Sequence, residues 1–320
     1  MKKKLISLIM AVCIAAKALV VCGGSKEDTK GKGLPEKMVF TYVTAPLNVP
    51  SIIEREKGIF ASEFEAMDIA VEYAELTSGA DQTQALASGD VQMLYAVGAT
   101  SVILSAANGA DIKVLNMYSR SPKAFCLYSK DAGINSPETL RDKTIAGPAG
   151  TNLHELLAAY LATADMTMDD VNYINMSIPE AKAALDGGSI DVALVAGATA
   201  YQAKQQGYHL VTDGEGYIDA IIAVAVTDDF YNKYPEVIER MVKAQETIAK
   251  FINENEAEAL EMVADTLDLE VTAVEEMYEY YNFSTEITDE DKKGFQKTAD
   301  FMYESGMIES KLDVDTLFFE

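Results

Sequence analysis

Short apolar runs alternate with amphipathic stretches along the chain from Met38 onward. Runs such as 38–44 (MVFTYVT) and 91–97 (VQMLYAV) are rich in β-branched and aromatic residues, which favours strands. The stretches between them, such as 49–60 (VPSIIEREKGIF), space their apolar residues as one face of a helix does. Strands that alternate with helices predict an α/β fold, with mixed, mostly parallel sheets flanked by helices.

The alternation runs to residue 227 and restarts once, at 143–147 (KTIAG). Two rounds of strands and helices predict two lobes. We expect strands at 38–44, 69–76, 91–97, 112–119, 143–147, 171–175, 190–196, 208–212 and 218–227, and helices at 49–60, 81–88, 101–108, 151–164, 179–185, 199–206 and 237–252.

An ungapped repeat supports two similarly built lobes. Residues 85–101 (ALASGDVQMLYAVGATS) align with residues 184–200 (ALDGGSIDVALVAGATA). Both copies read as a helix end, a glycine turn, a buried strand and a Gly-Ala-Thr loop before the next helix. Convergence on similar strand–helix chemistry is the alternative explanation. The identical pairs are Ala85/Ala184, Leu86/Leu185, Gly89/Gly188, Gly98/Gly197, Ala99/Ala198 and Thr100/Thr199.

The chain beyond the second round is helical. In 237–252, Ile238, Met241, Gln245 and Ile248 share one helix face on which only Gln245 is polar, so this face is expected to be buried. Helices without further strands predict a chain that crosses back and packs onto lobe 1.

Two crossings between the lobes, near 121–125 and 217–222, then form a two-stranded hinge. The predicted boundaries are 38–122 for the first part of lobe 1, 123–221 for lobe 2, and 222–320 for the hinge return and the helical remainder of lobe 1.

The N-terminus reads as an export leader. The basic start MKKK precedes the apolar run LISLIMAVCIAA, which has signal-peptide length and is short for a membrane span. The following residues resemble a bacterial lipobox, which predicts removal of residues 1–21, lipidation of Cys22 and a tether at 22–37. Val21 departs from the small residue usual before that cysteine, and cleavage after Ala18 is the alternative. The protein is therefore expected outside the cytoplasm, anchored to the cell membrane through Cys22, or secreted or periplasmic and soluble.

Charge and cysteine content narrow the partners. The chain has 26 basic and 51 acidic side chains, a net charge of −25, which argues against nucleic acid and anionic membrane surfaces. Loss of the four lysines in residues 1–21 leaves 22 minus 51, or −29. Cys13 lies in the leader and Cys22 is the candidate anchor. Cys126 is then the one remaining cysteine, so we expect no disulfide framework and no cysteine metal site. We also expect no cofactor.

The loops that follow the strands are the candidate binding site, because ligands of open α/β sheets lie beyond the carboxyl ends of the strands. Two facing sheets would share one cleft. The loops expected to line it are 44–50, 78–81, 98–101, 118–121, 147–154, 197–199 and 214–220.

Several of these loops place Gly, Ser or Thr at a helix start. Unpaired N–H groups and the helix dipole favour negative charge there, so a small oxyanion could bind without a formal counter-ion. The alternative is that Thr100, Thr151 or Asn152, and Thr199 are helix N-caps.

The stretch 147–155 (GPAGTNLHE) lacks the lysine of a phosphate loop and the three-glycine spacing of a dinucleotide site. His154 has neither a positioned nucleophile nor a metal-binding partner in the sequence, so we expect ligand contact or a structural role and no catalytic residue. Arg120 follows a strand and could approach the cleft from the hinge, or lie on the surface.

The chain resembles the solute-binding proteins of ABC importers for nitrate, sulfonates and taurine, over nearly all of the mature sequence. The residues that carry the resemblance are 78–101 (SGADQTQALASGDVQMLYAVGATS), the run 135–161 with Gly150, Thr151, His154, Leu156 and Leu157, and 184–195 (ALDGGSIDVALV). The likeness is nearest to the taurine and alkanesulfonate branch. It implies a two-lobed, type II-like periplasmic-binding-protein fold that captures a small anionic solute by hinge closure and passes it to a membrane permease with its ATPase.

By this resemblance, Ser78, Gly79, the loop 98–101 and the helix start at Thr151 and Asn152 would contact the acidic head group. Family members that bind sulfonates commonly carry Trp-x-Pro after the second-lobe Ile-Asp strand, whereas this chain reads VAGATA and has no tryptophan. The full set of predicted ligand-binding residues is Thr44, Asn48, Ser78, Gly79, Asp81, Gly98, Thr100, Ser101, Tyr118, Arg120, Gly150, Thr151, Asn152, His154, Thr199 and Tyr217.

Three alternatives remain at this level. The ligand could be a small heterocycle, such as a thiamine-precursor pyrimidine, stacked on Tyr42, Tyr95, Tyr118 and Tyr217. The chain could be an enzyme of the same fold, such as a pyrimidine synthase, although those enzymes carry a cysteine-rich motif that this chain lacks. It could also be a sensor domain for a membrane receptor.

Overall fold

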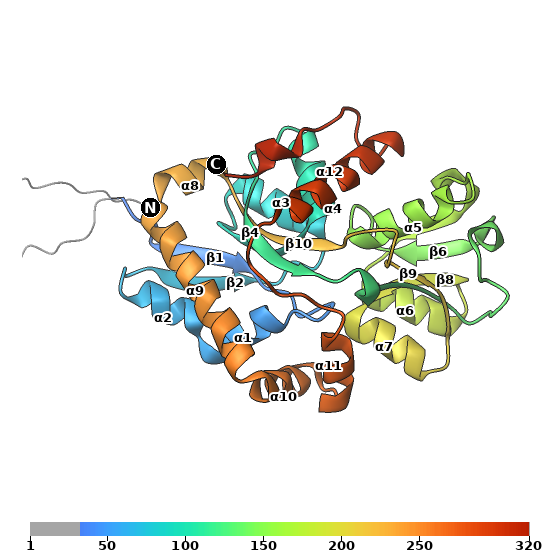
Figure 1. Cartoon of the computed structure of the whole chain (residues 1–320), viewed down its shortest axis with the longest axis horizontal. Coiled ribbons are helices and arrows are strands. Elements are labelled where there is room, and N and C mark those ends of the chain that lie inside the picture. Colours follow the sequence, from blue (N-terminus) through green and yellow to red (C-terminus); the bar gives the residue numbers. More distant parts are fainter. Residues whose placement is uncertain (1–32, 320) are drawn as a thin grey trace, which may run out of the picture. The chain divides into compact units, whose positions relative to one another are not determined.

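The structure, a computed structural model, describes residues 33–319 (Figure 1). The predicted signal peptide, most of the predicted tether and Cys22 lie outside the described residues. Within 33–319, no helix combines the length and the apolar character needed to cross a membrane.

We call residues 34–120 and 221–319 lobe 1. Its strands form one parallel pair and one three-stranded antiparallel sheet, whose central strand comes from beyond lobe 2 in the chain. The strands pair as β1-β2 and β3-β10-β4, with β1 (Lys37–Thr41), β2 (Ala70–Ala74), β3 (Leu94–Gly98), β4 (Lys113–Arg120) and β10 (Ile221–Val226). The helices are α1 (Val49–Lys57), α2 (Ile59–Glu65), α3 (Gly79–Ser88), α4 (Ala99–Ala107), α8 (Asp228–Lys233), α9 (Pro235–Glu254), α10 (Glu256–Leu267), α11 (Val271–Tyr278), α12 (Asp289–Glu304) and the 3₁₀ turn η4 (Val314–Leu317).

We call residues 125–213 lobe 2. Its strands form one sheet in the order β7-β6-β8-β5-β9. The sheet is buried on both faces, because side chains alternate between a cluster shared with α5 and one shared with α6 and α7. The strands are β5 (Phe125–Ser129), β6 (Thr144–Gly147), β7 (Asn172–Asn175), β8 (Val192–Ala196) and β9 (His209–Asp213). The helices are α5 (Asn152–Ala162), α6 (Ile178–Gly187) and α7 (Gly197–Gln205), with 3₁₀ turns η1 (Pro122–Ala124), η2 (Pro137–Leu140) and η3 (Met168–Asp170).

Strand direction departs in part from the sequence-based expectation. The sheets are mixed, as predicted, but β5 and β10 run antiparallel to both of their neighbours. These two strands follow the crossings between the lobes, so each enters its lobe at the edge where its neighbours end. A strand that begins at that edge must run against them, which makes the sheets less parallel than the alternation indicated.

The predicted repeat is visible in the backbone. Gly89 and Gly188 end α3 and α6 in the left-handed conformation, with φ of 81° and 72°. Glycine adopts this conformation without the strain that a Cβ atom brings. In each copy a buried strand follows, β3 or β8, and the next helix begins directly after it, so the two lobes share one local construction.

The chain passes between the two sets of strands near the positions that the sequence predicted for the crossings. β4 ends at Arg120 and β5 begins at Phe125, and the return runs from the end of β9 to the start of β10. A third segment, between α11 and α12, runs along β4, where Asn282 pairs with Arg120. From Leu34 the chain packs as one unit, so the exact lobe boundaries stay a prediction.

The helix α9 buries the face that its spacing predicted. Ile238, Met241 and Ile248 are buried, and so is the polar Gln245. Gln245 and Asn116 on β4 exchange two amide hydrogen bonds of 2.6 and 3.1 Å, which satisfies both side chains inside the core.

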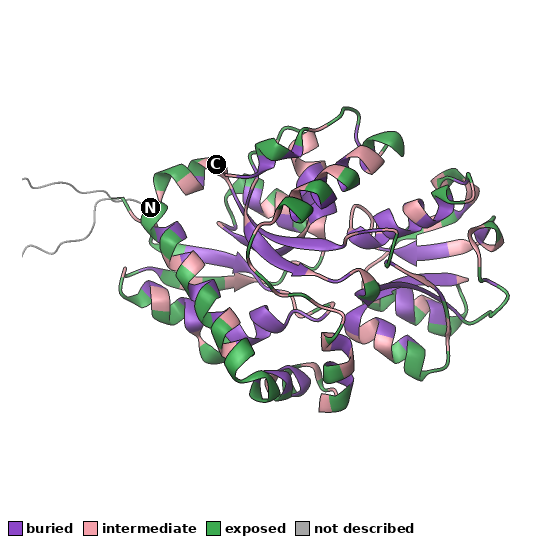
Figure 2. Ribbon diagram, viewed as in Figure 1, coloured by how far each residue is buried: buried purple, intermediate pink, exposed green. Residues whose placement is uncertain are grey.

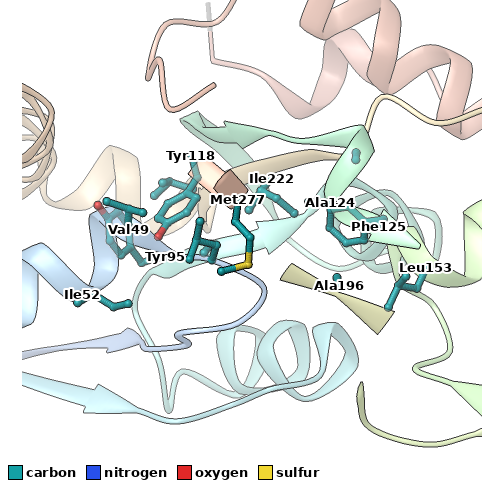
Figure 3. Close-up of a cluster of buried hydrophobic side chains, with 14 of the residues drawn as sticks. Val49, Ile52, Tyr95, Tyr118, Ala124, Phe125, Leu153, Ala196, Ile222 and Met277 are labelled. Carbon is teal, nitrogen blue, oxygen red and sulfur yellow. The ribbon is translucent and has the colours of Figure 1, made fainter. Parts of the chain in front are cut away.

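The largest apolar cluster passes from one lobe to the other (Figure 3). It joins Tyr95 and Tyr118 of lobe 1 to Phe125 at the hinge and Leu153 and Ala196 of lobe 2. Figure 2 shows the same arrangement as buried strands in both lobes beneath helices with exposed outer faces. Burial of this cluster favours lobes in contact over lobes apart.

A buried carboxyl group also connects the lobes. Glu155 on α5 accepts a hydrogen bond from the Thr298 hydroxyl on α12 (2.8 Å). Its second oxygen lies 2.8 Å from the hydroxyl of Thr100 on α4, which lies 2.9 Å from Oδ1 of Asn152. All four residues are buried.

The number of protons available for the hydrogen bonds among Thr298, Glu155, Thr100 and Asn152 favours a neutral Glu155. The Thr100 hydroxyl has one proton, and it can donate to only one of its two neighbours. If it donates to Asn152, then Glu155 must donate to it, which requires the protonated acid. Burial raises the pKa of Glu155, against the effect of the hydrogen bonds from Thr100 and Thr298.

We expect Glu155→Gln to keep the connection between the lobes, because the amide can donate to Thr100 and accept from Thr298. A group whose pKa is raised on folding stabilises the fold below its unfolded pKa, near 4.5, and loses that contribution as pH rises. Urea unfolding from pH 4.5 to 8 should therefore show wild type losing stability relative to Glu155→Gln. The exposed Glu309→Gln is the control. Parallel curves for wild type and Glu155→Gln would contradict a raised pKa.

Candidate functional site

Helices from both lobes begin at the edge where the lobes meet. The Ser101 hydroxyl on α4 donates to the Gly150 carbonyl (3.0 Å), and the Ala198 N–H at the start of α7 donates to the Pro46 carbonyl (3.2 Å). Gly79, at the start of α3, lies against Ser101. The structure thus brings together the predicted loops 44–50, 78–81, 98–101, 147–154 and 197–199.

Asn152 lies in the middle of these contacts. Its Oδ1 atom accepts from Thr100, whereas its buried Nδ2 atom has no partner among the described residues. The helices α4 and α5 begin at Gly98 and Thr151 without a side-chain cap. The first N–H groups of a helix have no partner within the helix and favour negative charge. Two uncapped helix starts and a free amide therefore provide hydrogen-bond donors for a small anion.

A cavity of about 880 Å³ opens beside this interface, and we call it the cleft cavity. Both lobes line it, and three predicted ligand-binding residues are among the lining: Thr44, Ser78 and Asp81. The complete lining is Tyr42, Val43, Thr44, Ala45, Glu75, Thr77, Ser78, Ala80, Asp81, Pro148, Ala149, Asn175, Met176, Ser177, Ile178, Pro179, Glu180 and Thr266.

The charged residues that line the cleft cavity are Glu75, Asp81 and Glu180. Hydrogen bonds from the side chain and N–H of Ser177 hold the pKa of Glu180 below its ordinary value, so it stays ionised at the start of α6. The nearest arginine, Arg55, stacks 4.2 Å from the Tyr42 ring centre and pairs with Glu75. An anion in this cleft would rely on N–H donors and not on a lining cation.

His154 supports the loop that leads into α5. Its Nδ1 atom accepts from the Gly150 N–H (3.2 Å), and its ring stacks on Tyr173 at 4.9 Å between ring centres. Tyr173 donates to the Gly147 carbonyl (2.7 Å), so the two rings hold both ends of the loop. Burial lowers the pKa of His154 and favours the neutral ring that this acceptor role needs.

Asn48 and Thr44 belong to the loop between β1 and α1. The Asn48 amide is buried and donates to the carbonyls of Val43 and Ala45, which shapes the loop that carries Pro46 to α7. Thr44 lines the cleft cavity. The structure therefore gives Asn48 a positioning role behind the lining.

Arg120 is neither directed into the cleft nor free on the surface. Its guanidinium donates to both carboxylate oxygens of Asp291, at 2.7 and 2.5 Å, and to the carbonyls of Ser284 and Glu286. The strand that carries it runs beside the segment between α11 and α12, whose carbonyls and Asp291 engage the guanidinium. The predicted approach of Arg120 to the cleft is thus corrected to a buried ion pair within lobe 1.

Tyr118, Tyr217 and Thr199 also lie outside the cleft cavity lining. Tyr118 is buried and its hydroxyl bonds to Ser51 (2.9 Å), and Tyr217 packs edge-on against Tyr160. Thr199 is half-buried as the third residue of α7.

The predicted aromatic stack for a heterocycle is not formed. Tyr95 and Tyr118 are 3% and 2% exposed and pack against each other in the core of lobe 1. Of the four tyrosines considered, Tyr42 alone lines the cleft cavity, since Tyr95 and Tyr118 pack on each other and Tyr217 packs on Tyr160.

The alternative that threonine side chains cap α4, α5 and α7 is wrong. The helices α4 and α7 begin earlier than the sequence indicated, after Gly98 and Ala196, which puts Thr100 and Thr199 inside the first turn. Thr151 donates its hydroxyl to the Pro148 carbonyl (2.8 Å) and does not cap α5.

The second-lobe loop 175–180, which is not among the predicted loops, lines the cleft cavity with Asn175, Ser177 and Glu180. A signal was available, since the loop follows a predicted strand and carries the Ser-x-x-Glu pattern of a capping box at 177–180. Asn175 also accepts from the Ala149 N–H (2.9 Å) and joins the two loops.

Residues 33–319 contain no group of three or more His, Cys, Asp or Glu side chains placed to hold a metal ion.

Two of the known proteins that are similar in sequence to this chain are named for the solutes they bind. The chain is 27% identical over 320 residues to an aliphatic sulfonates-binding protein of Bacillus subtilis (strain 168), covering 98% of this chain and 93% of the relative. It is 30% identical over 199 residues to the taurine-binding periplasmic protein of Escherichia coli (strain K12), covering 61% of this chain and 60% of the relative.

Among solved structures, the alkanesulfonate-binding protein SsuA from Xanthomonas axonopodis pv. citri, bound to MOPS, superposes with a TM-score of 0.80 at 18% identity. The match covers 89% of this chain and 98% of that one. The predicted fold of the periplasmic binding proteins is thereby confirmed.

Residues 46–259 match the family model described as NMT1/THI5 like. This span includes lobe 2 and most of lobe 1. It also includes 13 of the 18 residues that line the cleft cavity. The chain belongs to the NMT1/THI5-like family.

Proposed function

We propose that the protein captures a small organic solute with an acidic head group, of the sulfonate or taurine class, in the cleft between its lobes. The observation that carries the proposal is the buried Asn152 amide, which has a free Nδ2 atom beside the uncapped starts of α4 and α5. The names of the two curated relatives, which bind aliphatic sulfonates and taurine, support the same class of ligand.

In this proposal the head group accepts hydrogen bonds from Asn152 and from the first N–H groups of the uncapped helices α4 and α5. A sulfonate has three oxygens that can accept such bonds, and the helix dipoles stabilise its charge. The remainder of the solute lies in the cleft cavity. The carboxylates of Asp81 and Glu180 there suit a ligand with a positive group more than one with a second anionic group.

Closure of the two lobes holds the solute, and the closed form is presented to the permease of an ABC importer. The protein binds its solute without changing it chemically. Lipidated Cys22 anchors the mature chain outside the cytoplasm, with the soluble form as the alternative if Val21 prevents lipidation. Hinge closure of this kind is ligand-driven, because the solute contacts both lobes only in the closed form.

Titration calorimetry of the mature chain with ethanesulfonate and with taurine tests the proposal. We expect saturable one-to-one binding of at least one of them, and small-angle scattering that shows a smaller radius of gyration on binding. Absence of saturable heat for both solutes, with unchanged scattering, would overturn the proposed function.

We expect Asn152→Asp to weaken sulfonate binding by about tenfold or more, because a carboxylate oxygen replaces the free donor and repels the head group. Asn253→Asp on the exposed surface of α9 introduces the same charge away from the cleft and should leave affinity unchanged. Calorimetry of both variants makes the comparison. An equal loss in the two would point to overall charge and not to Asn152.

Gly197→Ala should prevent full closure. A Cβ atom there would lie 1.9 Å from the Pro46 carbonyl oxygen, so the backbone of one lobe must move. We expect a solute affinity lower by about tenfold or more, since apparent affinity falls with the closed fraction. Gly207→Ala is the matched control, because its φ is also positive, at 76°, but its Cβ atom meets nothing within 4 Å. Similar affinities for the two alanine variants would contradict this role of the contact.

A further inference from the structure

A second cavity, of about 420 Å³, lies on the hinge side of α7, and we call it the hinge cavity. One wall comes from lobe 2, through β5, β9 and α7, and the other from α11 and the residues that follow it. It shares no lining residue with the cleft cavity. Its lining is Lys123, Ala124, Cys126, Tyr128, Gly197, Ala200, Tyr201, Lys204, Tyr208, Leu210, Asp213, Glu215, Glu276, Met277, Tyr280 and Tyr281.

Tyrosines dominate the lining of the hinge cavity, which includes Tyr128 and Tyr201 from lobe 2 and Tyr280 and Tyr281 from lobe 1. The hydroxyl of Tyr281 is buried and has no hydrogen-bond partner among the described residues. The faces of phenol rings attract cations, and several rings around one space form the kind of site that binds quaternary ammonium groups.

One carboxylate of the hinge cavity forms no direct ion pair. Lys123 pairs with Glu215 (3.0 Å), and Lys204 pairs with Glu276. The Asp213 carboxylate forms no direct ion pair among the described residues and accepts only the N–H of Glu215 (2.9 Å), although its charge helps Glu215 to raise the pKa of Lys123. The lining therefore carries two positive and three negative groups, and Asp213 supplies the net negative charge.

We infer that the hinge cavity is a second binding site, for a small organic cation of the quaternary ammonium or protonated amine class. The cation lies against the tyrosine rings, and Asp213 balances its charge. Gly197 lies between the two regions, because it lines the hinge cavity and also lies against the Pro46 carbonyl of the cleft loop.

Both lobes contribute walls, so the hinge cavity has this shape only when α7 and α11 are in contact, as the Lys204–Glu276 ion pair requires. An occupant favours the arrangement that forms its site. The cation is therefore expected to favour closure, and by reciprocity a solute in the cleft would strengthen binding of the cation.

Calorimetry with choline chloride tests the inference without any solute in the cleft, so its outcome is independent of the proposed function. We expect saturable binding of choline at matched ionic strength, and binding weaker by about tenfold or more for the uncharged analogue 3,3-dimethylbutan-1-ol. Asp213→Asn and Tyr280→Leu should each weaken choline binding by about tenfold.

Asp81→Asn is the comparison, because it removes the same charge from the cleft cavity. Loss of choline binding in Asp213→Asn with retention in Asp81→Asn supports the hinge cavity. The inference is overturned by absence of saturable choline binding, by equal affinity for the uncharged analogue, or by a loss in Asp81→Asn that Asp213→Asn does not show. If Asp213→Asn fails to fold, Tyr280→Leu on the partly exposed segment after α11 gives the same decision.

Discussion

The two lobes meet backbone to backbone, and the other contacts of the cleft depend on that close approach. At Gly197 no side-chain atom separates the start of α7 from the Pro46 carbonyl. Gly79 acts within lobe 1, where a Cβ atom would overlap the Ser101 hydroxyl that donates to Gly150 of lobe 2. A larger residue at Gly197 would hold the lobes apart, and hydrogen bonds of about 3 Å between Thr100, Ser101 and the α5 loop could then not form.

Near the cleft, hydrogen bonds between uncharged groups join the two lobes. Glu155 is buried between two threonine hydroxyls, and as the neutral acid it can complete a chain that ends at Asn152. That chain holds the Asn152 amide so that Nδ2 stays free. An acidic protein can bind an anion in this way, since partial charges at helix starts attract the head group while the surplus carboxylates lie elsewhere. The hinge cavity shows the opposite arrangement, with ring faces and the unpaired Asp213.

The sequence predicted the elements, their order, the hinge crossings and the repeat, because these depend on local spacing and on the chemistry of turns. It also placed the loops that meet at the cleft, since the carboxyl ends of strands in one sheet share an edge. The same reasoning found the approximate start of α5 and the glycine turn before it. Strand direction at the hinge was less well predicted, because it depends on how the chain crosses between lobes.

Which side chains face the cleft was decided by tertiary structure alone. Tyr118 and Arg120 lie at the end of a strand and Tyr217 follows one, as Ser78 and Thr44 do, yet none of these three lines the cleft cavity. Arg120 is held by Asp291, Tyr118 bonds to Ser51 and Tyr217 packs on Tyr160. Their partners are distant in the sequence, and no local pattern specifies them. The sequence by itself therefore determined where ligand-binding loops can exist. Only the packing of the lobes decided which donors stay free, because a buried polar group is available to a ligand only when no distant residue satisfies it.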